Sequence, residues 1–216
     1  MPNHCGNRLT VSSINPKLAE DLVRFGEMSM RMKRAGNQRN EAFDICQYMQ
    51  MPKELENIHQ GGITINGKSY RERREIKKGK KVISIGVEPA EKEALIIKYG
   101  ACNSIDWCVK ILGTKWGTYE SHVTAGDGRL VYTYKTAWSP LSDACLQELS
   151  AKWPTLSFLM EYAERGDCYY GFCYAENGEI IAIDEGVITE AMYDKNGDFA
   201  AGPTMETYKE LVDMSG

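Results

Sequence analysis

A chain of 216 residues with 43% hydrophobic and 26% charged residues has the composition of an ordinary globular domain. It contains no apolar run near the roughly 18 residues that a membrane helix needs, so we expect no membrane partner. The N-terminus lacks the features of an export signal, and the seven cysteines form no CxxC pair. These features exclude a disulfide-built secreted protein and predict reduced thiols in a cytoplasm.

The first part of the chain predicts two strands and a helix. Residues 7–13 alternate apolar and polar side chains, as a half-buried strand does. Asn15 and Pro16 are typical of a helix N-terminus, and Leu22 lies on the apolar face of the helix that would follow. A period-two pattern over residues 42–48 predicts a second strand.

Residues 61–87 predict an inserted β-hairpin arm. Apolar residues alternate before Asn66-Gly67, a favoured turn, and return from Val82 to Ile85. Eight basic residues lie along the predicted ribbon against two acidic ones, a net charge of +6 that leaves −10 for the rest of a chain with net charge −4. The eight are Lys68, Arg71, Arg73, Arg74, Lys77, Lys78, Lys80 and Lys81.

The second half predicts helices and hairpins in alternation. Pro89–Tyr99 and a segment capped by Asn103 and stopped by Gly113 are predicted helices, and Ser139 with Pro140 is predicted to begin another that runs to about Lys152. Asn177-Gly178 predicts a two-residue turn. The predicted strands are 119–124, 130–137, 155–164, 169–174 and 180–184, and 203–214 is a predicted final helix. This order predicts an α+β fold around an antiparallel sheet, as one domain over residues 1–216.

Three of the four tryptophans, Trp107, Trp116 and Trp138, lie close together in the sequence. Each has a large apolar body and one N–H donor that needs a partner when buried. We expect them to form one aromatic cluster that joins a helix to the sheet, a structural role.

Several short motifs carry a family resemblance. They are MPN at the N-terminus, NRLTV from Asn7, MPKEL from Met51, YGA from Tyr99, DWC from Asp106, GTKW from Gly113 and TAWSP from Thr136. Together they resemble the YubB ferredoxin-like domain family of plasmid and bacteriophage proteins. Asn3, Trp107, Trp116 and Trp138 are the family-motif residues, and His4 stands where the family usually has a tryptophan.

The resemblance implies a ferredoxin-like α+β sandwich with helices on one face of an antiparallel sheet, encoded by a mobile element and acting in the cytoplasm of a bacterial host. It implies no cofactor, because the fold name describes a topology and the cysteines lack the spacing of an iron–sulfur site. The basic hairpin and a C-terminal extension over residues 187–216 lie outside it.

The sequence gives little support to a metal site. His4, His59 and His122 and the cysteines lack the spacing of a zinc site. We therefore expect each of them to be an isolated side chain in the core or on the surface, and we expect no bound metal. The segment from Asp194 to Asp198 has the oxygen ligands of a calcium loop, but Phe199 takes the place of the required glycine, which favours an ordinary turn.

Enzymatic candidates are few. Cys5 follows His4, and removal of Met1 would expose Pro2 as an amine that could act as a base. Neither has an evident catalytic partner, and we expect no catalytic activity.

Charge suggests binding instead. From Ser139 to Gly216 there are fifteen acidic residues against four basic ones, a net charge of −11 that could engage a basic surface. We therefore expect an accessory protein that binds a host protein and counters a host defence system. The alternative is a nucleic-acid-binding protein that uses the basic hairpin. A further interpretation is that the hairpin is only solvated, and that its charges keep an exposed strand edge from pairing with other chains.

Overall fold

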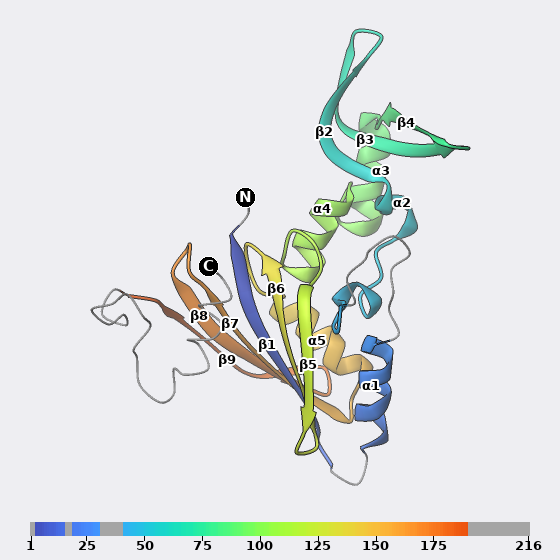
Figure 1. Ribbon diagram of the computed structural model, residues 1–216. Coiled ribbons are helices and arrows are strands. Elements are labelled where there is room, and N and C mark those ends of the chain that lie inside the picture. The colour runs from blue at the N-terminus through green and yellow to red at the C-terminus, as the bar shows by residue number, and fades with distance from the viewer. Residues whose placement is uncertain (1–2, 16–18, 31–40, 190–216) are drawn as a thin grey trace.

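The computed structural model describes residues 3–15, 19–30 and 41–189, and its main body is a six-stranded antiparallel sheet (Figure 1). The strands follow the order β5-β6-β1-β7-β8-β9. Their bounds are β1 (His4–Ser13), β5 (Tyr119–Gly126), β6 (Arg129–Ala137), β7 (Leu156–Glu164), β8 (Tyr169–Glu176) and β9 (Glu179–Val187).

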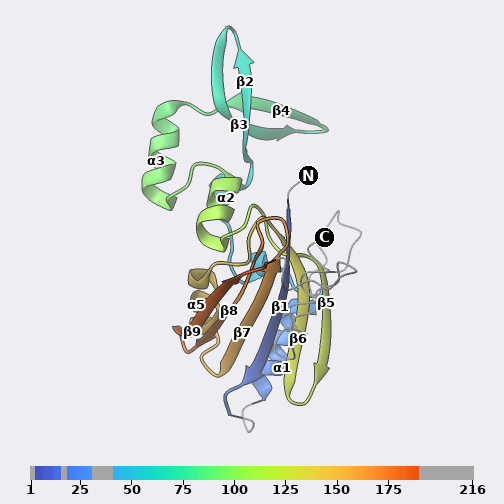
Figure 2. The ribbon, with the colours of Figure 1, turned by 90° about the vertical axis from the view of Figure 1, so that its left-hand side faces the viewer.

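Two helices, α1 (Glu20–Met30) and α5 (Asp143–Lys152), cover one face of this sheet (Figures 1 and 2). The chain runs β1-α1-β5-β6-α5-β7, and β1 lies between β6 and β7 in the sheet. This is the βαββαβ arrangement of the ferredoxin-like fold, so the predicted α+β class is confirmed. Strands β8 and β9 extend the sheet beyond β7.

Aromatic side chains fill the space between the sheet and its helices. Phe25 of α1 stacks on Tyr48 with ring centroids 4.9 Å apart and meets Phe158 of β7 edge to face at 5.6 Å. Phe43 lies 5.2 Å from both Tyr132 and Tyr134 of β6. Offset and edge-on contacts of this kind are favourable beyond their buried area. The core therefore joins α1, β6 and β7 through aromatic contacts.

A second unit is inserted between α1 and β5. Its sheet has the order β2-β3-β4, and Figure 1 shows it projecting from one end of the main body. The two-stranded hairpin predicted over 61–87 was wrong in its strand count: the structure has three strands over residues 58–86, because β3 is long enough to pair with β2 at one end and with β4 at the other. The elements are η2 (Ile45–Gln47), α2 (Lys53–Glu56), β2 (Ile58–Ile65), β3 (Lys68–Lys78), β4 (Lys81–Gly86), α3 (Pro89–Tyr99), α4 (Ser104–Trp107) and the π-helical η3 (Cys108–Leu112).

The strand predicted over 42–48 was wrong. Asp44 caps the short 3₁₀ helix η2 by accepting a hydrogen bond from the Cys46 amide at 3.0 Å. The amides of Phe43 and Ile45 donate to the hydroxyls of Ser121 and Thr118. Side-chain oxygens and backbone bonds within the segment satisfy these amides, and no described strand pairs with it.

The predicted start of the helix at Ser139 was also wrong. Ser142 caps α5, because its hydroxyl accepts from the Cys145 amide, whereas the Ser139 hydroxyl donates to the Gly113 carbonyl. The turn at Asn177-Gly178 is confirmed, with φ values of 48° and 79°. The predicted helix over 203–214 and the Asp194–Asp198 turn lie outside the described residues. None of the described helices is long and apolar enough to span a membrane.

Candidate functional site

The eight basic residues of the predicted arm lie on β3, in the turn that follows it and at the start of β4, and ion pairs engage three of them. Lys68 Nζ is 2.6 Å from Glu88, Arg74 is 2.5 Å from Glu91, and Arg73 is 3.7 Å from Glu75. These acidic partners come from β3 itself and from the start of α3. Part of the basic charge is therefore neutralised within the inserted unit.

The other five basic residues have no ion pair with any described residue. Four of them, Lys77, Lys78, Lys80 and Lys81, surround Gly79 at the tip of the β3–β4 hairpin, where Gly79 takes the left-handed conformation of a turn. Lys78, Lys80 and Lys81 are exposed. The fifth, Arg71, is exposed further along β3. Four of the five arm cations without an ion pair among the described residues thus lie at one tip.

Exposed apolar side chains adjoin this tip. Val82 is 57% exposed, and Ile83 and Ile85 of β4 are exposed as well. Val82 pairs with Lys77 and Ile83 pairs with Ile76, so lysines and aliphatic side chains share the hairpin. We call residues 77–85 the hairpin tip.

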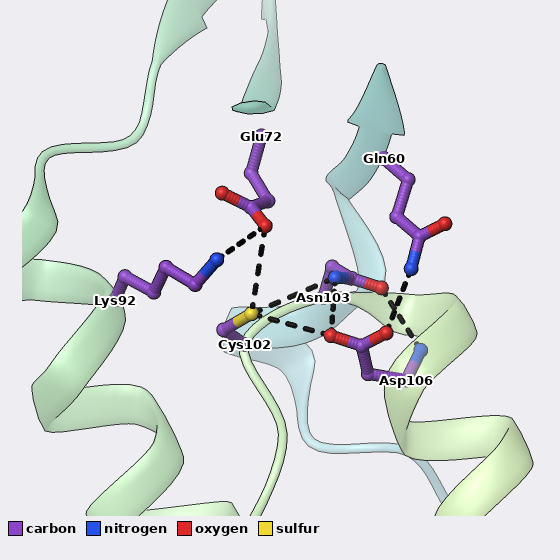
Figure 3. A network of polar contacts seen from close by, with 6 residues as sticks. All are labelled: Gln60, Glu72, Lys92, Cys102, Asn103 and Asp106. Carbon is purple, nitrogen blue, oxygen red and sulfur yellow. Dashed lines mark hydrogen bonds and ion pairs between the residues drawn. The ribbon is translucent and has the colours of Figure 1, made fainter. Parts of the chain in front are cut away.

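A polar network joins the β2-β3-β4 sheet of the inserted unit to α3 and α4 (Figure 3). Glu72 of β3 accepts from Lys92 of α3 at 2.6 Å, and Gln60 of β2 donates to Asp106 of α4 at 2.7 Å. Cys102 lies between these pairs and donates to Asp106 at 3.3 Å. The network thus links both neighbouring strands of the insert to its helices.

The helix cap of α4 belongs to the same network. The Asn103 side-chain oxygen Oδ1 accepts from the Asp106 backbone amide at 2.9 Å, and the Asn103 side-chain nitrogen donates to the Asp106 carboxylate at 2.7 Å. This confirms the predicted N-cap. Asn103 is completely buried and Glu72 nearly so, which makes the network a structural joint whose polar groups all have partners.

Cys102 is not an activated nucleophile. Burial, followed by the hydrogen bond to Asp106, raises the pKa of the Cys102 thiol to about 11. At neutral pH it stays a thiol that donates to carboxylates, and the thiolate is the reactive form of cysteine.

The same reasoning applies to Cys5. It is fully buried, and burial raises the pKa of its thiol far above its ordinary value. His4 pairs instead with the Tyr119 hydroxyl at 2.5 Å, and the Cys5 thiol donates to the Gly6 carbonyl and the Asn7 side chain. Pro2 lies outside the described residues. In the described part of the chain, no three His, Cys, Asp or Glu side chains gather as a metal site would require.

The three motif tryptophans do not form one cluster. Trp107 is buried at 6% exposure, whereas Trp116 and Trp138 are 40% and 43% exposed. These two rings flank Lys115, whose ammonium lies 5.1 Å from the Trp116 centroid and 4.6 Å from that of Trp138. The expected single cluster was wrong, because two of the rings lie over a surface lysine. Asn3, the fourth motif residue, accepts from the Trp138 amide.

The acidic residues of the second half are spread over several elements. Glu164 is buried and accepts from the amides of Gly166 and Asp167. Glu161 lies 4.0 Å from Arg8 on β1, and Glu148 pairs with Lys152 within α5. Several of these charges therefore serve local contacts.

Sequence reasoning missed one aromatic column. Tyr170, Phe172 and Tyr174 alternate along β8, whereas Cys173 between them is buried. Met160 pairs with Cys173 on the helix-covered side, so the three rings lie on the other face of the sheet. The alternation from Tyr169 to Tyr174 predicted a strand. It could not indicate which face of that strand the helices cover, because that depends on how α1 and α5 pack on the sheet.

Comparison with known proteins gives a ferredoxin-like match. Residues 115–202 match the model of a family described as the ferredoxin-like domain in Api92-like protein. The crystal structure of the protein api92 from Yersinia pseudotuberculosis is similar at 12% sequence identity and a TM-score of 0.46, over 94% of this chain and 100% of that one. No curated protein matches the chain. The family match over residues 115–202 and the βαββαβ topology confirm the ferredoxin-like part of the predicted resemblance, whereas the YubB name and the plasmid or bacteriophage source remain predictions.

Proposed function

We propose that the protein is a non-catalytic accessory protein of a plasmid or bacteriophage that binds a host protein in the bacterial cytoplasm. Its contact surface is the hairpin tip, and its partner presents an acidic surface with apolar groups. Binding of this kind would serve to counter a host defence system. The motif resemblance supports the source, and the arrangement of the hairpin tip supports the kind of partner.

The observation that carries the proposal is the combination of charge and apolar surface on one projecting hairpin. Lysines without an ion pair among the described residues lie beside Val82 and Ile83. Protein interfaces join an apolar centre to a charged rim, and complementary charge accelerates the encounter of the partners.

Nucleic acid is the alternative partner, favoured by four lysines within residues 77–81. Proteins that bind single-stranded nucleic acid stack its bases on aromatic side chains and also contact its phosphates. The one aromatic residue of β3, Tyr70, is already engaged. Its hydroxyl donates to Glu88, Lys68 lies 5.1 Å from its ring centroid, and a Cβ at Gly86 would overlap the ring. The tip therefore offers aliphatic groups and no ring for a base to stack on, which favours a protein partner over a single strand.

The state of two cysteine thiols supports the non-catalytic role in this proposal. Both Cys5 and Cys102 hold their protons at neutral pH because their burial disfavours the thiolate. Among the described residues, no hydrogen bond joins either thiol to a histidine.

The experiment is a double charge reversal, Lys78→Glu with Lys80→Glu, in a tagged full-length chain. The control, Lys53→Glu with Arg129→Glu, makes the same change in net charge at two exposed sites away from the tip. We expect a stoichiometric acidic host protein to be retained by the wild type and the control and lost with the tip variant.

Retention that is equal for both variants would contradict the proposal. Salt-dependent retention of nucleic acid by the wild type, abolished only by the tip variant, would establish the alternative partner.

A further inference from the structure

A cleft of about 370 Å³ lies at the N-terminal end of α5, away from the hairpin tip. One wall is the loop from Ser139 to Ser142, and the opposite wall is formed by side chains of β7, β8 and β9. Its volume is at the lower end of the range for ligand pockets.

A strained residue shapes the loop wall. Trp138, the last residue before the loop, has φ of 75°, a left-handed conformation that a bulky side chain rarely adopts. Two contacts hold it there. Its amide donates to the Asn3 carbonyl at 2.9 Å, and its carbonyl accepts from the Tyr169 hydroxyl of β8 at 3.0 Å. Such strain is concentrated at functional sites and persists only where the surroundings enforce it.

The interior of the cleft is apolar and aromatic. Leu141 and Met160 are buried in its lining, and Tyr162 and Tyr169 meet edge to face with ring centroids 6.1 Å apart. Gly171 leaves room for the first of these rings, because a Cβ there would lie 2.6 Å from the Tyr162 hydroxyl. Tyrosine faces attract cations through the negative charge of the ring system.

The charge of the cleft is negative. Glu185 of β9 accepts from the Tyr162 hydroxyl at 3.2 Å and has no ion pair among the described residues. The described lining contains no Lys, Arg or His. Asp143 also lines the cleft, and one of its carboxylate oxygens accepts from the Ala144 amide at the helix terminus, so a ligand would meet two carboxylates, with Glu185 lying beside the tyrosine rings.

An anionic ligand is disfavoured at the same place. The Cys145 amide donates to the Ser142 hydroxyl, and the Ala144 amide donates to Asp143. These bonds occupy the amides that a helix N-terminus would otherwise offer to an anion.

We propose that the cleft binds the guanidinium group of an arginine side chain that a partner polypeptide presents. A guanidinium is planar, stacks on aromatic faces and donates to carboxylates, and the methylenes of arginine suit an apolar floor. The site is independent of the hairpin tip, which has the opposite charge, so either proposal can fail without the other.

The test is an NMR titration of the full chain that follows the ring resonances of Tyr162 and Tyr169. The probes are N-acetyl-arginine methylamide, its uncharged isostere N-acetyl-citrulline methylamide, the lysine equivalent and free arginine. We expect saturable shifts with the blocked arginine and binding weaker by about tenfold or more with the citrulline probe, since charge-assisted hydrogen bonds contribute that much.

Variants separate the carboxylate from general surface charge. Glu185→Gln is expected to weaken arginine binding by about tenfold, whereas Glu179→Gln, an exposed carboxylate on the same strand, should leave it unchanged. Equal binding of arginine and citrulline probes, equal effects of the two variants, or no shift with any probe would overturn the proposal. A preference for the lysine probe would overturn the choice of guanidinium, and binding of free arginine alone would overturn the polypeptide source.

Discussion

The buried ion pair at the base of the inserted unit gives the sharpest stability prediction. Glu72→Gln removes the charge that faces Lys92, whose ammonium lies 2.6 Å from the Glu72 carboxylate. The Glu72 side chain is 11% exposed and that of Lys92 is 33% exposed. Removing one partner of a fully buried pair costs about 3–5 kcal/mol. Because Lys92 can reach water, we expect a loss of about 2 kcal/mol in the free energy of unfolding.

Glu88→Gln is the matched comparison, because it breaks an ion pair of equal length in the same unit. The Lys68 and Glu88 side chains are 57% and 52% exposed, so solvent screens their attraction and we expect no measurable loss. Urea denaturation of Glu72→Gln and Glu88→Gln compares their free energies of unfolding. A double-mutant cycle of Glu72→Gln with Lys92→Met measures the coupling energy between Glu72 and Lys92. Equal losses for Glu72→Gln and Glu88→Gln would refute the reasoning that burial decides the strength of these pairs.

The remaining predictions concern thiols, a buried hydroxyl and a glycine. The free energy of unfolding should fall as pH rises from about 9 to 11, because burial raises the pKa values of the Cys102 and Cys173 thiols from 9.0 to about 11 in the folded protein. The unfolded chain therefore loses these thiol protons at lower pH than the folded chain does. A urea midpoint that stays constant over this pH range would contradict this. Iodoacetamide should label Cys168 first in the native protein, since it is the exposed cysteine, and Cys168→Ser should abolish this label. Tyr134→Phe should raise the free energy of unfolding by about 1 kcal/mol, because the Tyr134 hydroxyl is buried without a hydrogen-bond partner in the described part of the chain. Gly171→Ala should lower the thermal midpoint strongly, since its Cβ would lie 2.5 Å from the Asp184 carbonyl, and an unchanged midpoint would refute that packing.

Local sequence signals predicted much of the fold. Asn177-Gly178 and the cap at Asn103 depend on the preferences of one or two residues, and the structure has both. Two serines near the start of α5 could each act as a cap. Tertiary contact decided between them, because Ser139 bonds to the carbonyl of Gly113, 26 residues earlier in the chain.

The sites depended on contacts that sequence alone does not specify. The sequence indicated a cluster of basic residues in the inserted unit but did not indicate which of them are neutralised. The carboxylates that pair with Lys68 and Arg74 come from the start of α3. The exposure of Trp116 and Trp138 likewise could not be inferred from residue type. The cleft joins residues from 113 to 185, so no local pattern indicates it.

Photo-cross-linking from the hairpin tip tests the central claim most directly. The photoreactive residue p-benzoylphenylalanine would replace Val82, which is 57% exposed, or Val23 of α1, a matched control that is 60% exposed. After irradiation in the bacterial host, we predict one abundant adduct with an acidic host protein from position 82 and none from position 23. Adducts with nucleic acid from position 82, or the same protein adducts from both positions, would contradict the proposed function.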